Sequence, residues 1–480
     1  MGQIKQANEG ASNPFRALRN YNFRLFWLGQ LVSLIGAWMQ GLAQGWLILV
    51  LADPATRQAV FSHGGDAAAA VQSHASSAAE HTANLYSGFV NFAGGLPVLL
   101  LTLFAGVIID RVNKRKLIMI TQSTAMMCAL VTGTLIHERI ITINELLALA
   151  LILGISMAAD MPSRQSFVPS LVPQEDVPSA VALNSSMFNS ARALGPAIAG
   201  YLLARHVSLE NCFFCNAASY VAVLIALGLM RGKNLGAPRP RSDGDNNVIA
   251  NLRAGFSYVR HDHTALNVVL LVGVFGMFGF SFNVLIPPFV KYTLLPHSIE
   301  AAQIRAFGLL ETVRGLGALA GAISVAVFAS MGKQKLQLII GSLLSTACLV
   351  VFAFARDMSV AYGAMAVVAF GFVLCFATCN TLLQLTVPDE LRGRVMAIYS
   401  LMFVGTGPIG SLMAGSLAAH IGARPTIFFF AMVSLVAALF ACFRPGGIRS
   451  LKVAARKLPP PLRQEPLGEG EPDAPFVGGQ

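Results

Sequence analysis

The sequence predicts an all-α polytopic membrane protein, in which twelve transmembrane helices form two pseudo-symmetric bundles of six. Three observations predict this fold: the composition, the length of the uncharged runs and an internal repeat. Of the 480 residues, 55% are hydrophobic and only 12% are charged, which is about half the charged share of an ordinary soluble protein. The hydrophobic residues occur in blocks, and a block of about 20 apolar residues can cross a bilayer as a helix.

The twelve expected spans follow one another along the chain. Uncharged runs occupy residues 25–52, 91–109, 117–136, 212–230, 264–290, 336–355, 358–388, 395–419 and 425–443. Three further apolar spans contain charges: Glu145 and Asp160 in 140–163, Arg192 in 179–204, and Glu311 and Arg314 in 306–330. A soluble core does not need so many long apolar runs, so the chain is expected to lie in a lipid bilayer.

An internal repeat divides the spans into two groups. A shift of 215 residues aligns VPQEDVPSAVALNSSMFNSARALGPAIAG with VPDELRGRVMAIYSLMFVGTGPIGSLMAG, and ten of the 29 aligned positions are identical. Gly195 then matches Gly410, and Gly200 matches Gly415. We therefore expect two six-helix halves of the same orientation, which is typical of transporters that rock one half against the other.

The longest connection between spans predicts the domain boundaries. It separates a first bundle at 25–231 from a second bundle at 264–443. The connection itself, 232–263, is a Gly/Pro/Asp-rich linker followed by Ile249, Leu252, Phe256 and Val259 at helical spacing, which predicts an amphipathic helix on the membrane surface. Residues 1–24 form an N-terminal segment, and the Pro/Gly-rich composition of the tail 444–480 predicts disorder.

The basic residues predict the orientation. If both termini are cytoplasmic, the cytoplasmic segments hold 25 of the 34 Lys and Arg residues and the outer loops hold seven, in agreement with the positive-inside rule. Contact with anionic lipid headgroups then explains the net charge of +11. Nucleic-acid binding is not expected, because the charge has this other origin.

The cysteines and histidines do not form a pattern typical of a metal site. The seven cysteines lie within or at the ends of spans, where packing as small apolar residues is their ordinary role. The outer loop 53–84 contains His63, His74 and His81, but its Ala/Ser composition predicts an inserted, poorly packed segment that is disordered or loosely helical. We therefore expect no metal and no cofactor.

One short motif connects the sequence with a known superfamily. The stretch GVIIDRVNKR resembles the signature G-x-x-x-D-R-x-G-R-R that follows the second helix in the major facilitator superfamily, through Gly106, Asp110, Arg111 and Arg115. Asn113 replaces the last glycine, and Asn tolerates the left-handed turn that glycine favours. The wider sequence resembles the branch that contains enterobactin exporters and macrolide-efflux proteins, in the stretches FRALRNYNFRLFWLGQLVSLIGAWMQGLAQGWLIL, MPSRQSFVPSLVP, ARALGPAIAG and NTLLQLTVPDELRGRVMAIYSLMFVGTGPIGSL.

This resemblance implies a secondary active transporter of a bacterial inner membrane. It implies a monomer that exports a small organic molecule, siderophore-like or drug-like, in exchange for protons. The sequence contains no G-x-x-x-x-G-K-[ST] loop, so ATP-driven pumping by this chain is not expected. Two alternatives stay open: an importer or facilitator with the same fold, and a non-transporting membrane sensor or membrane enzyme. The sequence shows no Ser/His/Asp or HExxH constellation for the enzyme.

The resemblance also implies a latch between the halves on the cytoplasmic side. In the family fold the end of helix 2 lies beside the start of helix 11, so Asp110 is expected near a helix N-terminus, which carries a partial positive charge, and near Arg392 and Arg394. Arg111 and Arg115 are expected to anchor the loop. The alternative is that these charges only fix the topology.

A substrate cavity is implied between helices 1, 4, 7 and 10 of the family fold. The polar lining that these helices offer is Gln40, Gln44, Asp160, Asn283, Asn380 and Gln384, and the apolar walls are Trp38, Trp46 and Phe282. The alternative for Asp160 is an ion pair with Arg164, one helical turn further on.

The charges inside spans predict an ion pair between the halves. Ionisable groups at membrane depth are costly and face a partner or water. Counting 1.5 Å per residue places Arg192 and Glu311 at similar depths, about 10 to 12 Å from the outer face. In the family fold helices 5 and 8 pack together there through small residues. The small residues of helix 5 are Gly195, Pro196 and Gly200.

We therefore expect an Arg192–Glu311 pair that closes the outer side and opens as the halves move. The alternative is a static pair of Glu311 with Arg314 inside helix 8. Because two cations then accompany one carboxylate, the sequence also suggests an anionic substrate.

Overall fold

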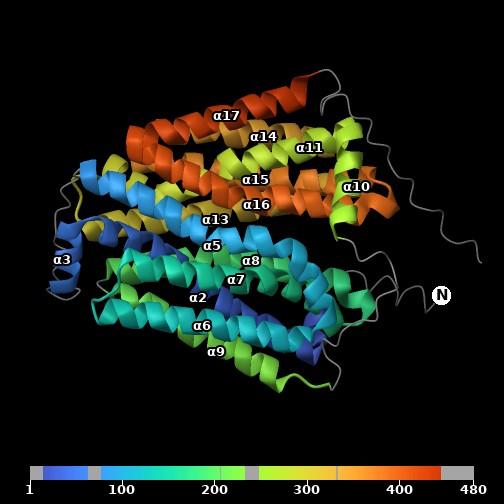
Figure 1. Cartoon of the computed structure of the whole chain (residues 1–480), viewed down its shortest axis with the longest axis horizontal. Coiled ribbons are helices and arrows are strands. Elements are labelled where there is room, and N and C mark those ends of the chain that lie inside the picture. Colours follow the sequence, from blue (N-terminus) through green and yellow to red (C-terminus); the bar gives the residue numbers. More distant parts are fainter. Residues whose placement is uncertain (1–14, 63–76, 206, 233–247, 331–332, 445–480) are drawn as a thin grey trace, which may run out of the picture.

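The computed structural model describes residues 15–62, 77–205, 207–232, 248–330 and 333–444. Long helices run side by side in one elongated bundle (Figure 1). Those of the first half are α2 (Tyr21–Ala52), α5 (Ser77–Arg111), α6 (Lys114–His137), α7 (Ile143–Phe167), α8 (Val177–Ala204) and α9 (Leu209–Leu229). Those of the second half are α11 (His263–Val274) with its continuation to Leu294, α13 (Glu300–Ser330), α14 (Gln334–Ala353), α15 (Met358–Thr386), α16 (Asp389–Ile421) and α17 (Ala423–Phe443). The expected all-α fold is confirmed.

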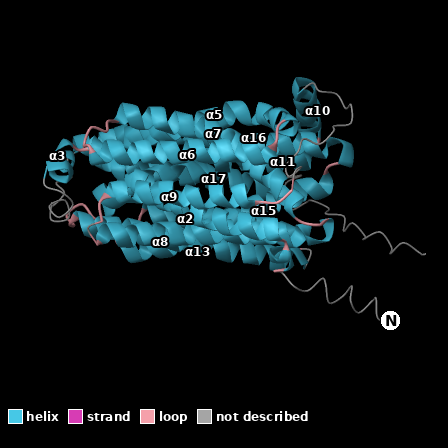
Figure 2. Cartoon of the chain, turned by 90° about the horizontal axis from the view of Figure 1, so that it is seen from below, coloured by secondary structure: helices cyan, strands magenta, loops and turns pink. Residues whose placement is uncertain are grey.

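The two halves lie next to each other, with the first in the lower part of Figure 1 and the second in the upper part. They meet along two seams, where α5 packs on α16 and α8 packs on α13. The short helix α3 (Pro54–Ser62) lies at one end of the bundle, and α10 (Val248–His261) lies at the other (Figures 1 and 2). We call these the α3 end and the α10 end.

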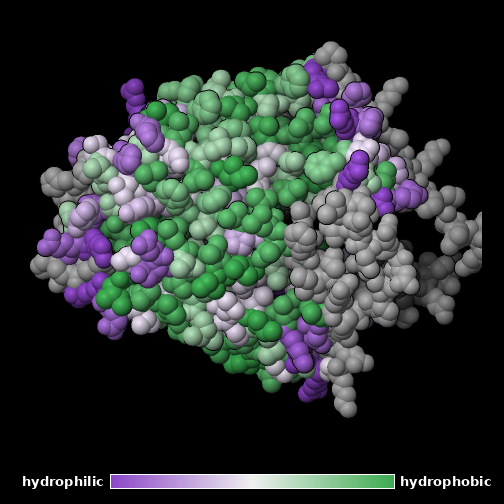
Figure 3. Space-filling model, in the orientation of Figure 1, coloured by the Kyte–Doolittle hydropathy of each residue, from purple (hydrophilic) through white to green (hydrophobic). Residues whose placement is uncertain are grey.

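The surface and the helix lengths identify an integral membrane protein. Apolar residues cover the middle of the molecule, and hydrophilic residues gather toward its two ends (Figure 3). Among the described residues, eleven helices are long and apolar enough to cross a membrane. They do not include α8, whose 28 residues carry Arg192 but lie within the bundle against α2 and α13.

Local capping signals fix where several helices begin. Thr142 and Glu145 form a capping box at the start of α7, and the Asp357 carboxylate accepts from two backbone N–H groups at the start of α15. Such caps satisfy the N–H groups that the first turn leaves unpaired. Asn113 is also an N-cap: its side chain accepts from the backbone N–H of Lys116 at 3.1 Å, with φ at −68°. The expected left-handed turn at Asn113 is therefore wrong.

The outer loop is more ordered at its ends than its composition predicts. Residues 54–62 form α3, and residues 77–84 form the first turns of α5. Asp53, Thr56 and Asn84 are 7%, 3% and 0% exposed. The expectation of a poorly packed segment is wrong for these parts, because their polar side chains bond across the bundle. His63 and His74 lie outside the described residues, as do the predicted tail 445–480 and the first 14 residues.

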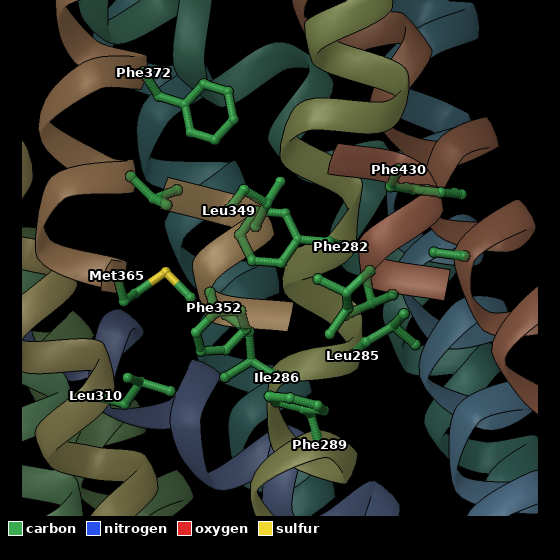
Figure 4. Packing of buried hydrophobic residues seen from close by; sticks show 14 of the residues in the cluster. Phe282, Leu285, Ile286, Phe289, Leu310, Leu349, Phe352, Met365, Phe372 and Phe430 are labelled. Atoms are coloured by element: carbon green, nitrogen blue, oxygen red, sulfur yellow. The ribbon is translucent and has the colours of Figure 1, made fainter. Parts of the chain in front are cut away.

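The first span of the second half is not a regular helix. After α11 the chain forms a π-helical turn at Phe275–Phe280, a 3-10 turn at Ser281–Leu285, the short α12 (Ile286–Pro288) and another π turn at Phe289–Leu294. Pro287 and Pro288 have no N–H to donate, which interrupts a regular ladder. Phe282, Leu285, Ile286 and Phe289 nevertheless pack in the core of the second half (Figure 4). Short π segments are frequent at functional sites.

Candidate functional site

The two seams depend on glycines that bring backbones into contact. A Cβ added to Gly200 of α8 would lie 2.8 Å from the Cα of Gly308 in α13. A Cβ added to Gly415 of α16 would lie 2.7 Å from the Cα of Gly88 in α5. Because only glycine permits this approach, Gly200 and Gly415, which the repeat aligns, perform the same task in the two halves.

The helix 5 small-residue motif divides its contacts between two neighbours. Gly200 and the Pro196 carbonyl face α13 across the seam. Gly195 faces α2 within the same half, where an added Cβ would lie 2.5 Å from the Cβ of Trp38. The motif therefore positions Trp38 as well as closing the seam.

A buried polar cluster joins the halves at the α3 end. Lys291, 1% exposed, donates to Thr56 Oγ1 at 3.3 Å, and its Nζ lies 4.0 Å from Asp53 Oδ2. Thr56 donates in turn to Asp53 at 2.5 Å. Beside them the Trp46 indole N–H donates to Glu300 Oε1 at 2.8 Å. Asp53, Thr56 and Trp46 belong to the first half and the others to the second, so this α3-end cluster holds that end closed.

Sequence reasoning missed this cluster for an identifiable reason. Asp53, Lys291 and Glu300 each lie at or just beyond the end of an apolar span, where charges ordinarily meet headgroups and water. The weak signal was Lys291, which directly follows the long uncharged run 264–290. On the other seam the same end is joined by Asn84, which donates to the Ala418 carbonyl at 3.2 Å, and by His81, whose ring lies 5.9 Å from that of His420.

Toward the α10 end, the α8 face that packs on α13 becomes uncovered. Ala193 and Gly200 are buried in the seam, and an added Cβ on Gly315 would lie 2.7 Å from the Ala193 Cα. The same helix face continues at a spacing of three to four residues to Ser185 and Ala182, which are both exposed. The halves are therefore in contact near the α3 end of this seam and apart near its α10 end.

Arg192 and its neighbours lie where the seam changes from closed to open. On α8, Arg192 points between the face that meets α2 through Gly195 and the face that meets α13 through Ala193. Its guanidinium carbon lies 5.7 Å from the centroid of the Trp38 ring. Trp38 in turn packs edge-on against Phe188 with ring centroids 5.7 Å apart, and Phe188 is 41% exposed.

The expected Arg192–Glu311 ion pair is wrong for this structure. Glu311 instead pairs with Arg314, one turn along α13, and Arg314 also donates to the Asn283 side chain in the 3-10 turn. The glycine contacts explain the difference, because they place Arg192 level with Leu316. Glu311 is then five residues, about 7 Å, closer to the α3 end. Counting depth from the helix starts did not give this register.

Asp160 is a structural centre of the first half. Its carboxylate accepts from Thr121 Oγ1 at 2.7 Å and from Gln122 Nε2 at 2.9 Å, and it pairs with Arg164. Gln122 also accepts from Ser33 of α2 at 3.4 Å. This network joins α2, α6 and α7 and satisfies a carboxylate that is only 4% exposed, so the alternative role of Asp160 in a pair with Arg164 is the one observed.

The other expected lining residues fall into two groups. Gln40, Trp46 and Phe282 are buried at 8%, 0% and 1% exposure, and Gln40 accepts from Asn216 of α9 at 2.6 Å. Their expected place in a lining is wrong, because each is packed within the bundle. Gln44, Asn283 and Asn380 are partly exposed and Gln384 is exposed, with Gln384 donating to Asn380.

The residues of the expected cytoplasmic latch are only partly visible. The backbone of α5 is described to Arg111, but the side chains of Gly106's neighbours, Asp110 and Arg111 lie outside the described residues. Arg115 donates to the Gly228 carbonyl at 3.0 Å, which ties α6 to α9. At the start of α16, the Arg394 carbonyl and Ile398 pack on α10, where a Cβ added to Gly255 would lie 3.0 Å from that oxygen. Arg392 is half-buried nearby.

Known proteins share this sequence and fold. The family described as transmembrane secretion effector matches residues 57–467. The multidrug efflux pump Tap of Mycolicibacterium fortuitum is 24% identical over 379 residues, which are 78% of this chain and 90% of Tap. The staphyloferrin A transporter of Staphylococcus aureus is 26% identical over 68% of this chain and 80% of its own. The enterobactin exporter EntS of Salmonella choleraesuis is 25% identical over 65% and 72%.

Solved structures agree with the fold. The nucleoside transporter NupG superposes with a TM-score of 0.63 at 13% identity, over 87% of this chain and all of the NupG chain. The D-xylose–proton symporter superposes with a TM-score of 0.59 at 14% identity, over 86% and 96%. Fold and seams define a polytopic membrane transporter. The chain belongs to the transmembrane secretion effector family of the major facilitator superfamily, as its motifs predict.

Proposed function

We propose that the protein is a secondary active exporter of a bacterial inner membrane that couples proton entry to the efflux of a small organic molecule. Relatives named for multidrug, staphyloferrin A and enterobactin transport support this class of cargo. We propose that it acts as a monomer with both termini in the cytoplasm, since the basic residues gather in the segments at the α10 end.

One observation carries the proposal: the α8/α13 seam is closed at one end and open at the other. The α3-end cluster buries Lys291, Asp53 and Glu300 between the halves, while the seam face of α8 is exposed at Ser185 and Ala182. With the α10 end in the cytoplasm, this arrangement suits the loading of cargo from inside. Export then requires the opposite state, in which the α10 end closes and the Trp46–Glu300 contact breaks.

Proton entry can supply the required energy. One charge that moves inward across 100 mV releases about 2.3 kcal/mol. Because a tenfold gradient corresponds to about 1.4 kcal/mol, this electrical contribution alone supports a gradient of about 45-fold. The latch expected around Asp110 belongs to the same proposal: it would stabilise the state in which the α10 end is closed. Asp110→Asn should then reduce transport without changing membrane insertion.

The direction of transport tests the proposal. Metabolites in the medium of wild-type and deletion strains are compared first, and the compound that the deletion strain fails to release is labelled. Inside-out vesicles should accumulate it when their lumen is acidified, and a protonophore should stop accumulation. Accumulation only in right-side-out vesicles would instead support the importer. Unchanged metabolites and no transport in either orientation would support the sensor.

A further inference from the structure

Arg192 is a cation at membrane depth without a protein counter-ion in the described part of the chain. No described carboxylate lies within 4.0 Å of it, because the nearby Glu311 is paired with Arg314. Its Nε is buried and has no hydrogen-bond partner among the described residues. Such a charge is costly in hydrocarbon and therefore requires water or an anion beside it.

The surroundings of Arg192 leave it directed toward a ligand. One face of the guanidinium is covered by the Trp38 ring at 5.7 Å, an arrangement that leaves the N–H edge of a guanidinium accessible. On the side of the α10 end, the exposed Phe188 continues the same aromatic surface. The position between α2 and α13 belongs to both halves, so a ligand there would sense their relative movement.

The charge count specifies the ligand further. Across this part of the seam Arg192 and Arg314 supply two positive charges and Glu311 supplies one negative charge, so one positive charge is uncompensated. A guanidinium binds a carboxylate through two parallel N–H···O bonds. A single carboxylate on an apolar or aromatic body would neutralise the excess charge and pack on Trp38 and Phe188.

We propose that Arg192, Trp38 and Phe188 form the subsite for the carboxylate and adjoining apolar group of a monoanionic substrate. This inference rests on the proposed function and adds the substrate class. Arg192 holds the carboxylate at the closed end of the open seam, and Phe188 contacts the body of the molecule on the side from which it enters.

A matched pair of ligands tests this subsite in the purified full-length protein in nanodiscs. Indole-3-acetate and indole-3-acetamide have nearly the same shape and differ in charge, and naphthoate with naphthamide provides a second pair. Binding is measured by calorimetry. In the unmodified protein each carboxylate should bind about tenfold or more tightly than its amide, as a charge-assisted hydrogen bond allows. Arg192→Gln should remove this preference, and Arg192→Lys should keep part of it.

Arg205→Gln is the matched control. Arg205 is on the same helix and also covers an aromatic ring, with its guanidinium carbon 5.3 Å from the Tyr201 centroid, but it is exposed at the α3 end. This variant should keep the full preference. Equal binding of acid and amide, binding of neither acid, or a preference that survives Arg192→Gln in a folded, monodisperse protein would overturn the subsite. Carboxylate binding without export would instead refute the proposed function, and export restricted to neutral compounds would refute only the subsite.

Discussion

The seam between α5 and α16 and the seam between α8 and α13 share one construction but differ in charge. In both, a pair of glycines seven residues apart approaches the backbone or a small residue of the other half. The four contacts are Gly88 with Gly415, Gly95 with Pro408, Gly308 with Gly200, and Gly315 with Ala193. The contacts of one seam correspond to those of the other under the internal repeat, so the duplicated unit supplies the close approach of the halves.

The charged residues are found on only one of the two seams. Asn91 of α5 stands three residues after Gly88, as Glu311 stands three after Gly308. By the same correspondence Gly94 occupies the position of Arg314, and Gly407 occupies that of Arg192. The shared glycines therefore explain how the halves meet, whereas Arg192, Glu311 and Arg314 are additions to one seam, and recognition of a charged ligand belongs there.

The largest expected effect comes from blocking either seam. Gly200→Val or Gly415→Val would bring a side chain against backbone atoms of the other half, less than 3 Å from the added Cβ. Because both seams must close, each variant should reduce transport to background in vesicles. Gly407→Val is the matched control, since an added Cβ there meets nothing within 4 Å, and it should retain most activity. Loss in only one seam would contradict the mechanical equivalence.

Removing the buried carboxylate should separate the seams by stability. Glu311→Gln leaves Arg314 without its partner, and breaking a buried ion pair costs about 3 to 5 kcal/mol. Asn91→Ala removes only a bond to the Ser87 carbonyl in its own helix, at 2.9 Å, and should cost about 1 kcal/mol. Unfolding in detergent measures both. The double variant Glu311→Gln, Arg314→Gln should recover most of the loss; equal costs for Glu311→Gln and Asn91→Ala would refute the distinction.

A smaller effect is expected from the α3-end cluster. Lys291→Met leaves Asp53 buried without its cation and so favours separation of the halves at that end. A cysteine introduced by Ala199→Cys, at a position that is 0% exposed, should then react several-fold faster with a membrane-impermeant maleimide from the outer side. Asp160→Asn, which alters the network of the first half only, should not change the labelling rate. Equal rates with and without Lys291→Met would exclude the cluster as a closure.

The sequence predicts the scaffold better than the site for physical reasons. Apolar length and repeat depend on local sequence, so the spans, the halves and the glycine seam could be anticipated. The partner of Glu311 depends on the register of α8 against α13, which a count of residues from each helix start does not determine. Likewise Trp46 and Phe282 are large apolar residues that fit a cavity wall and a core equally well, and only packing distinguishes the two. Lys291 resembled an ordinary charge at a span end.

Distances across the α8/α13 seam test the central claim, that its two ends open in turn, most directly. In a cysteine-free background, spin labels are attached through Arg205→Cys with Ile299→Cys at the α3 end, and through Ser185→Cys with Ala322→Cys at the α10 end. Double electron–electron resonance is recorded at neutral and acidic pH, with and without transported substrate. The account predicts a short α3-end and a long α10-end distance in the ligand-free protein at neutral pH, and a second population in which this order is reversed. A single distance distribution at each end under all conditions would contradict it.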